Sequence, residues 1–329
     1  MFRPRSFETL DFMATQSSTI PAPRPTDQAK NRARRSLALA LTVAGFLLPG
    51  LLLFTLFFIF PIIQAAYFSL FKWNGLGPLE NFIGLQNYSR LFQDQVFQGA
   101  LAHNLVLIVL SIAIQLPLSL GLALLVWRKL PGRALFRTIF FLPYVLSEVI
   151  IGIIWSFIYH PEFGLVNLFL KSLSPSLGAQ AWLGDPKTAL SAIFVVLCWK
   201  YIGFHAILYL AGLEQIPSEL EEAARIDGAS DVQILRYVII PLLGSTIRLT
   251  IYLSILGSLQ VFALVWVMTQ GGPVNSSDTM ATYLFKFGFQ RFALGYGSAV
   301  AVTLFLIGFG ISLAYQQALL RQDYAGSPN

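Results

Sequence analysis

Six long apolar runs dominate this sequence and limit the folds that are open to it. They cover residues 37–63, 101–127, 135–158, 189–210, 242–268 and 297–319. Each run has at least the roughly 20 residues that a helix needs to cross a hydrocarbon core. Because backbone groups in lipid must be satisfied within the segment, each run should be helical. The pattern predicts an all-α polytopic membrane protein with six transmembrane helices.

The composition supports a membrane protein. Hydrophobic residues make up 56% of the chain and charged residues only 12%, whereas soluble domains have about 25% charged residues. Cys198 is the one cysteine, which excludes an internal disulfide and a cysteine-based metal cluster. The net charge of +6 does not require nucleic acid, since membrane proteins keep Lys and Arg on their cytoplasmic side.

The segments outside the apolar runs are short. Residues 1–36 carry Pro21, Pro23, Pro25 and a basic run, and they predict a flexible cytoplasmic tail. The run after Arg35 is longer than the apolar part of a signal peptide, which disfavours a cleaved leader. We expect a six-helix membrane domain over residues 37–320 and a cytoplasmic tail over 321–329.

The distribution of Lys and Arg predicts the orientation. With the N-terminus inside, twelve of these residues lie on the inner side: Arg24, Lys30, Arg32, Arg34, Arg35, Arg128, Lys129, Arg133, Arg137, Arg225, Arg236 and Arg321. Six lie on the outer side: Lys72, Arg90, Lys171, Lys187, Lys286 and Arg291. The excess predicts that both termini lie in the cytoplasm and that the protein spans the cytoplasmic membrane.

The predicted cytoplasmic segment 213–241 contains residues that are typical of helix ends. Ser218 with Glu221, and Ser230 with Gln233, each have the spacing of a capping box at a helix N-terminus. Gly228 lies between the two and is a typical C-terminal stop for the first helix. The segment therefore predicts two short helices joined by a turn, the second running toward Pro241 at the start of the fifth span.

Ionisable and polar residues within the spans are candidates for function, because they are costly in lipid. Glu148 lies in the third run and Lys200 in the fourth. They could neutralise each other, or both could face a central cavity and hydrogen-bond a polar solute. Tyr201 and Phe204 offer aromatic rings for stacking, and Ser258 and Gln260 add hydrogen-bonding groups in the fifth run.

Several function classes lack support in the sequence. There is no Gly-x-x-x-x-Gly-Lys-Ser/Thr segment for ATP binding, and no His-Glu-x-x-His or Gly-x-Ser-x-Gly motif for hydrolysis. His103, His160 and His205 lack metal-ligand spacing. We therefore predict no catalytic residues, no metal and no bound cofactor. An ion-coupled carrier that uses Glu148 or Lys200 remains an alternative.

Two segments resemble those of a known family. The first contains Glu222-Ala223-Ala224, Asp227-Gly228-Ala229 and Ile240-Pro241, and it resembles the Glu-Ala-Ala loop of ABC-importer permeases. The second, Thr269-Gln270-Gly271-Gly272-Pro273, resembles a Thr-x-Gly-Gly-Pro segment of carbohydrate-importer permeases of the maltose or glycerol-phosphate type. The resemblance covers roughly residues 40 to 320 and implies a type I ABC importer permease fold.

The resemblance also implies residue roles. The first segment would dock on an ATPase as a cytoplasmic coupling helix through these residues: Glu221, Glu222, Ala223, Ala224, Asp227, Gly228 and Pro241. Matched to maltose permease, the sugar-contacting positions fall on Tyr144, Glu148, Lys200, Tyr201, Phe204, Ser258 and Val261. Only Tyr144 keeps the family's residue type, which puts maltose itself in doubt.

In this family the permease is one part of a larger importer. The resemblance implies a second permease subunit, two ATPase subunits that use ATP and Mg²⁺, and an external solute-binding protein. It also implies transport of a sugar, such as a di- or oligosaccharide or a related polyol glycoside, by alternating access. A permease for glycerol-3-phosphate or another small polar solute is the alternative.

Overall fold

The computed structural model describes residues 25–127, 132–174 and 180–320. The described residues are helices joined by turns and loops, with one isolated β-bridge between Phe71 and Phe82. The all-α class predicted from the apolar runs is therefore confirmed. The chain divides into two units, residues 1–61 and 62–329.

The described part of the first unit is helical. α1 covers Pro25–Phe54 and continues through a π-helical turn at Thr55–Ile59 into α2, Phe60–Phe68. The first candidate span is Ala38–Phe68. The sequence predicted a flexible tail over residues 1–36, but residues 25–36 already belong to α1. The rest of that tail, and the predicted tail 321–329 with Arg321, lie outside the described residues, as do Arg128 and Lys129.

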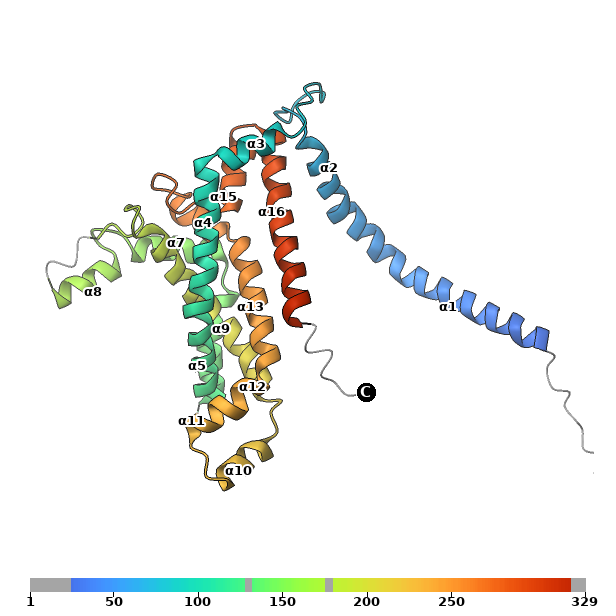
Figure 1. Cartoon of the computed structure of the whole chain (residues 1–329). Helices are drawn as coiled ribbons and strands as arrows, with labels where there is room; N and C mark the ends of the chain where they lie inside the picture. The colour runs from blue at the N-terminus through green and yellow to red at the C-terminus, as the bar shows by residue number, and fades with distance from the viewer. Residues whose placement is uncertain (1–24, 128–131, 175–179, 321–329) are drawn as a thin grey trace, which may run out of the picture. The chain divides into compact units, whose positions relative to one another are not determined.

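The second unit holds the remaining helices, which Figure 1 labels. Those longer than a few residues are α3 Gln86–Gln93, α4 Gln95–Leu110, α5 Leu116–Trp127, α6 Arg133–Val145, α7 Glu148–Ile158, α8 Leu165–Leu173, α9 Ala189–Leu213, α10 Ser218–Ile226, α13 Gly244–Leu259, α14 Ala263–Thr269 and α16 Leu294–Tyr315. The short ones are α11 Asp231–Ile234, α12 Ile240–Leu242 and α15 Met280–Leu284. Single π-helical turns cover Ser111–Gln115, Leu235–Ile239, Phe285–Gln290 and Gln316–Leu320.

Three long helices form the frame of this unit. α4 and α5 join through the turn Ser111–Gln115 into one span, Gln95–Trp127, and α9 and α16 are the other two. Asp94 caps α4, where its side chain accepts from the backbone N–H groups of Val96 and Phe97. α5 packs along α9, and α13 packs against both α9 and α16. α10 lies at one end of this bundle and α3 at the other (Figure 1), and we name the ends after these helices.

The third apolar run is not one straight helix, contrary to the prediction for residues 135–158. α6 ends at Val145, α7 begins at Glu148, and the two are bent by 97°. Leu146 and Ser147 have extended backbone angles between them. Pro143, near the end of α6, removes a backbone donor. Ser147 and Glu148 lie at this bend, but the run is apolar on both sides of them, so the sequence analysis treated it as one helix.

The fifth run is also broken, contrary to the prediction for residues 242–268. Residues 231–242 and α13 are bent by 67°, so the span begins at Gly244 and Pro241 precedes it. α13 then ends at Leu259, and α14 begins only at Ala263. α14 packs against α7, and Gly152 of α7 allows the close approach of Val267. Counting each bent pair as one span, the described residues hold up to six.

Candidate functional site

A cavity of about 330 Å³ lies between the two broken spans. Its walls come from the turn Ser111–Gln115, the α6–α7 break, α9, and α13 with the break that follows it. Non-helical backbone within a membrane is tolerated where it is buried in protein or lines a cavity. Interrupted helices of this kind form the solute sites of many transporters.

The cavity brings together seven of the eight residues that the sequence predicted for a substrate path. These are Tyr144, Glu148, Tyr201, Phe204, Ser258, Gln260 and Val261. The rings of Tyr144 and Phe204 stack with centroids 4.7 Å apart and planes 17° apart. Tyr201 donates a short hydrogen bond from its hydroxyl to the carboxylate of Glu148. The result is an aromatic wall beside one carboxylate.

Lys200 is the exception, because it does not line the cavity. Its side chain is buried, with 4% of the residue exposed. The ammonium group donates to the carbonyls of Tyr144, at 3.2 Å, and Leu146, at 2.7 Å. These carbonyls lie at the C-terminal end of α6, where no further turn of helix can satisfy them. Lys200 therefore caps the α6–α7 break, and among the described residues it forms no direct ion pair with Glu148.

Asn104 holds the second break, and the sequence analysis missed it. Its amide nitrogen donates to the carbonyl of Ser258, at 2.7 Å, and its amide oxygen accepts from the backbone of Met280, at 2.8 Å. The hydroxyl of Thr279 donates to the carbonyl of Val261, at 2.8 Å. Residues far apart in the chain thus satisfy the carbonyls that the end of α13 leaves free. An Asn inside an apolar run was the available signal.

The cavity is also lined by four polar residues that the sequence analysis did not select. They are Ser111, Gln115, His205 and Ser254. All four are buried and come from the middle of apolar helices. Polar side chains that recur on one face of a span could have indicated these residues. The sequence alone, however, does not show which face of each helix points to the cavity, because that depends on how the helices pack.

The segment predicted for coupling forms two short helices at the α10 end of the bundle (Figure 1). α10 begins at Ser218 as predicted, but the predicted capping box does not form, because Pro217 occupies the N-cap position. The second box is confirmed: Ser230 and Gln233 exchange hydrogen bonds at the start of α11. Arg225 bridges the helices, at 3.9 Å from Glu221 and 3.8 Å from Asp231.

The turn after α10 depends on Gly228, which has a φ of 82°. The N–H of Ala229 donates to Ala224 at 2.9 Å, and that of Gly228 donates to Arg225 at 3.1 Å. This pair of bonds defines a Schellman motif, in which the left-handed residue is usually glycine. Glu222, Ala223 and Asp227 are exposed on α10. The described helix therefore leaves these acidic and small residues exposed.

The Gly-Gly-Pro segment lies at the other end, over a buried ion pair. Lys286 donates to Asp278 at 2.8 Å, and Asp278 is fully buried. Burial raises the pKa of the Asp278 carboxyl above its ordinary value, while the hydrogen bond from Lys286 opposes that rise. Gly271 passes so close that a Cβ there would lie 1.7 Å from an oxygen of Asp278. The glycine is needed for this close approach.

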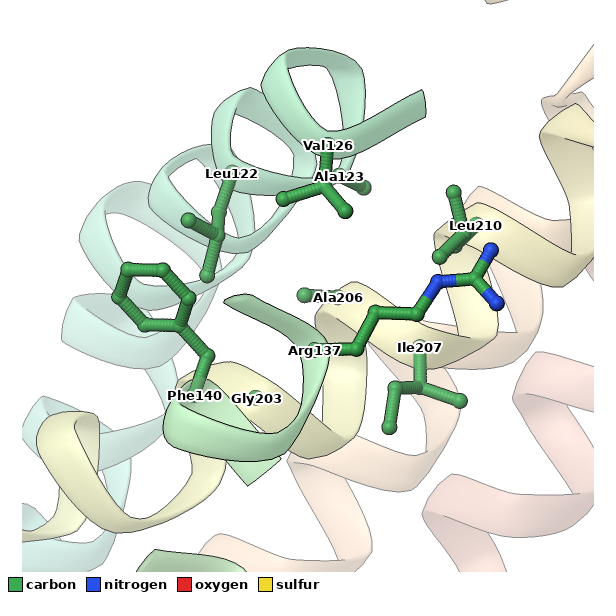
Figure 2. Close-up of a pocket in the computed structure, with 9 residues that line it drawn as sticks. All are labelled: Leu122, Ala123, Val126, Arg137, Phe140, Gly203, Ala206, Ile207 and Leu210. Carbon is green, nitrogen blue, oxygen red and sulfur yellow. The ribbon is translucent and has the colours of Figure 1, made fainter. Parts of the chain in front are cut away.

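A smaller pocket of about 20 Å³ lies between α5, α6 and α9. Figure 2 shows that apolar side chains such as Leu122, Ala206 and Ile207 line it and that Arg137 extends across it toward Leu210. The guanidinium of Arg137 donates to Glu214 at 2.6 Å. Arg137 is its one charged lining residue, so this pocket does not resemble a site for a polyhydroxyl solute.

These features define a polytopic permease with a cavity between interrupted helices and an exposed helix hairpin at one end. Comparison with known families agrees: residues 115–325, more than half of the chain, match the family described as binding-protein-dependent transport system inner membrane component. The chain belongs to this family, the membrane permeases of ABC importers. The family that the two sequence segments suggested is therefore confirmed.

Curated relatives match over nearly their whole length. The probable ABC transporter permease YurN of Bacillus subtilis is 38% identical over 270 residues, which cover 82% of this chain and 92% of YurN. The diacetylchitobiose uptake system permease NgcF of Streptomyces coelicolor is 32% identical over 308 residues, which cover 89% of this chain and 87% of NgcF.

A solved structure shares the fold. A chain of a bacterial ABC transporter that imports the acidic polysaccharide alginate superposes with a TM-score of 0.77 and 25% identity. The match covers 88% of this chain and 99% of that one. The type I ABC importer permease fold implied by the sequence is therefore confirmed. Neither the relatives nor this match assigns a role to an individual residue of the cavity or of α10.

Proposed function

We propose that this chain is a permease subunit of a sugar importer and that it moves a di- or oligosaccharide, or a related polyol glycoside, by alternating access. One observation carries the proposal: the cavity between the two broken spans combines stacked aromatic rings with hydrogen-bonding groups. Sugars present exactly this pairing of apolar ring faces and hydroxyls. Relatives whose names mention diacetylchitobiose, multiple sugars and starch degradation products support it.

Within the cavity, each group has a proposed role. Tyr144 and Phe204 receive the apolar face of a sugar ring. Glu148 accepts from sugar hydroxyls, and the hydrogen bond from Tyr201 fixes its orientation. Ser258 and Gln260 bind further hydroxyls beside the second break, where Val261 supplies apolar contact. Lys200 acts indirectly, because it holds the break that positions Tyr144 and Glu148.

The proposed energy source is a partner. α10 would dock on an ATP-binding subunit through Glu221, Glu222, Ala223, Ala224, Asp227 and Gly228, and Pro241 would help to set the bend that joins it to α13. ATP and Mg²⁺ act in that subunit. The full importer would contain a second permease, two ATPases and an external solute-binding protein, with the α10 end and both termini of this chain in the cytoplasm.

The charge of the cavity disfavours the alternative solute glycerol-3-phosphate. Among the described residues that line it, Glu148 is the one carboxylate, and neither Lys nor Arg is present. A phosphate group would lie near a like charge without a cation to bind it. The exposed α10 hairpin similarly disfavours an ion-coupled carrier, which would have no use for an ATPase docking helix.

Reconstitution tests the proposed function. The chain would be purified with the subunits that co-purify with it and placed in liposomes together with its solute-binding protein. We expect ATP-dependent uptake of diacetylchitobiose or maltotriose, with little uptake of glycerol-3-phosphate. Uptake of glycerol-3-phosphate alone would contradict the sugar assignment, and uptake by this chain without an ATPase would contradict the importer assignment.

A further inference from the structure

Two buried polar atoms without a hydrogen-bond partner lie at the wall of the large cavity. They are Nδ1 of His205, on α9, and Oγ of Ser254, on α13. His205 is 4% exposed and Ser254 is 5% exposed. Buried polar groups in native proteins are nearly always hydrogen-bonded, so each such atom calls for an explanation. Their common position at one cavity suggests a common ligand.

The two helices that carry these atoms run in opposite directions, and their polar residues fall into layers one helical turn apart. Toward the α10 end, the hydroxyls of Tyr209 and Thr250 bond to each other at 2.8 Å. His205 lies four residues before Tyr209 on α9, and Ser254 lies four residues after Thr250 on α13. A further four residues in each direction reach Tyr201 and Ser258, which belong to the proposed sugar site.

The layers differ in how they are satisfied. The Tyr209–Thr250 layer is closed by its own hydrogen bond and lies outside the cavity. The His205–Ser254 layer lines the cavity and has partners for neither atom among the described residues. Gln115, in the turn Ser111–Gln115, also lines the cavity. The His205–Ser254 layer, which we call the open layer, therefore lies next to empty space, and the Tyr209–Thr250 layer, the closed layer, does not.

We propose that His205 and Ser254 form a second hydroxyl-binding subsite, about one helical turn closer to the α10 end than the Tyr201–Ser258 layer. A sugar hydroxyl both donates and accepts, so it can satisfy an imidazole nitrogen in either tautomer and a serine hydroxyl. The ring of Phe204 lies edge-on to His205, with centroids 5.2 Å apart, and limits its rotation. The subsite extends the path of the solute toward the α10 end and rests on the proposed function.

The test compares variants of the open and closed layers in the intact reconstituted importer. His205→Phe and Ser254→Ala remove a hydrogen-bonding group from the open layer, and Thr250→Val removes one from the closed layer. The probe is whichever of diacetylchitobiose and maltotriose the wild-type complex transports. We expect KM for uptake to rise roughly 3- to 10-fold for each open-layer variant, the effect of losing one hydrogen bond.

Further readouts separate binding from structure. The open-layer variants should keep the Tm of the wild-type complex, and His205→Asn, which retains a polar group near the position of Nδ1, should restore KM. Thr250→Val should lower Tm and leave KM unchanged. An unchanged KM in both His205→Phe and Ser254→Ala, with uptake intact, would overturn the subsite alone. A wild-type complex that transports neither sugar would overturn the proposed function and the subsite with it.

Discussion

The ammonium group of Lys200 lies among backbone carbonyls, whereas the carboxylate of Glu148 lies against a tyrosine hydroxyl at the cavity. Both residues were selected from the sequence for the same reason, the cost of a charge within a span. Their surroundings give them different tasks. Lys200 stabilises the break between α6 and α7, whereas Glu148 lines the cavity.

Replacing Lys200 should therefore affect assembly more than replacing Glu148. In Lys200→Met two carbonyls at the helix break lose their donor, and hydrogen bonds to charged groups contribute about 1.5–3 kcal/mol each. We expect a lower Tm and less assembled complex. Glu148→Gln keeps an acceptor for Tyr201, so it should preserve Tm and change sugar selectivity. A Tm that falls in Glu148→Gln but not in Lys200→Met would contradict these assignments.

The Asp278–Lys286 pair predicts a dependence on pH. In Lys286→Met the pKa of Asp278 should rise further above its ordinary value, because burial already raises it and the opposing partner is gone. A carboxyl whose pKa is raised by folding contributes most to stability below its unfolded pKa and loses that contribution as pH rises through the folded pKa. The variant should thus be least stable at neutral pH, by several kcal/mol for an unpaired buried charge.

Thermal unfolding of the purified complex at pH 5 and pH 7.5 measures this effect. The difference in Tm between wild type and Lys286→Met should shrink at pH 5. Lys187→Met serves as the control, since Lys187 is an exposed lysine on a loop and should show no such difference. Equal losses at the two pH values in Lys286→Met would argue against a charged Asp278 at neutral pH.

At the scale of elements, the breaks in the helices shape the cavity as much as the helices do. α6 and α13 both stop at membrane depth, and each stop delivers residues to the cavity: Tyr144 and Glu148 from one, Ser258 and Val261 from the other. The short helices beyond the stops, α7 and α14, pack against each other. A pair of uninterrupted helices would leave the same residues on helix faces without this converging geometry.

The α10–α11 hairpin supports a test with a matched control. Gly228 has a φ of 82°, and a Cβ there would meet no atom within 4 Å, so a side chain would add backbone strain and no collision. Gly228→Val should cost about 1–3 kcal/mol locally and reduce the sugar transported per ATP hydrolysed. Gly228→Asn, which tolerates this conformation, should keep coupling. Full coupling in Gly228→Val would show that the turn is not required.

For the whole molecule, the proposed orientation puts the α10 end inside and the α3 end outside. Single cysteines in a Cys198→Ala background would test it with a membrane-impermeant thiol reagent on intact cells. Asn74→Cys and Lys171→Cys, both exposed at loops or helix ends predicted to be external, should be labelled. Val232→Cys, which is 73% exposed on α11, should be labelled only after the membrane is opened. The reverse pattern would overturn the orientation.

The sequence alone determined the features that depend on local composition. Apolar length predicted the spans, Ser230 with Gln233 predicted a cap, and Gly228 predicted a left-handed turn, because each rests on residues within a few positions of one another. The family segments added the importer fold. Seven of the eight predicted path residues reach one cavity, although whether they contact a solute stays a prediction.

Only the tertiary structure decided where the helices break and which polar side chains face the cavity. The break after α6 is held by Lys200, 54 residues beyond Leu146, and the break after α13 by Asn104 and Thr279. Polar residues lie at both breaks, Ser147 and Glu148 at one and Gln260 at the other. Polar residues such as Gln115 also lie within an unbroken span, so the local pattern alone does not mark a break. A backbone can leave the helix within a membrane only when distant groups satisfy its freed carbonyls, and that pairing exists only in the folded chain.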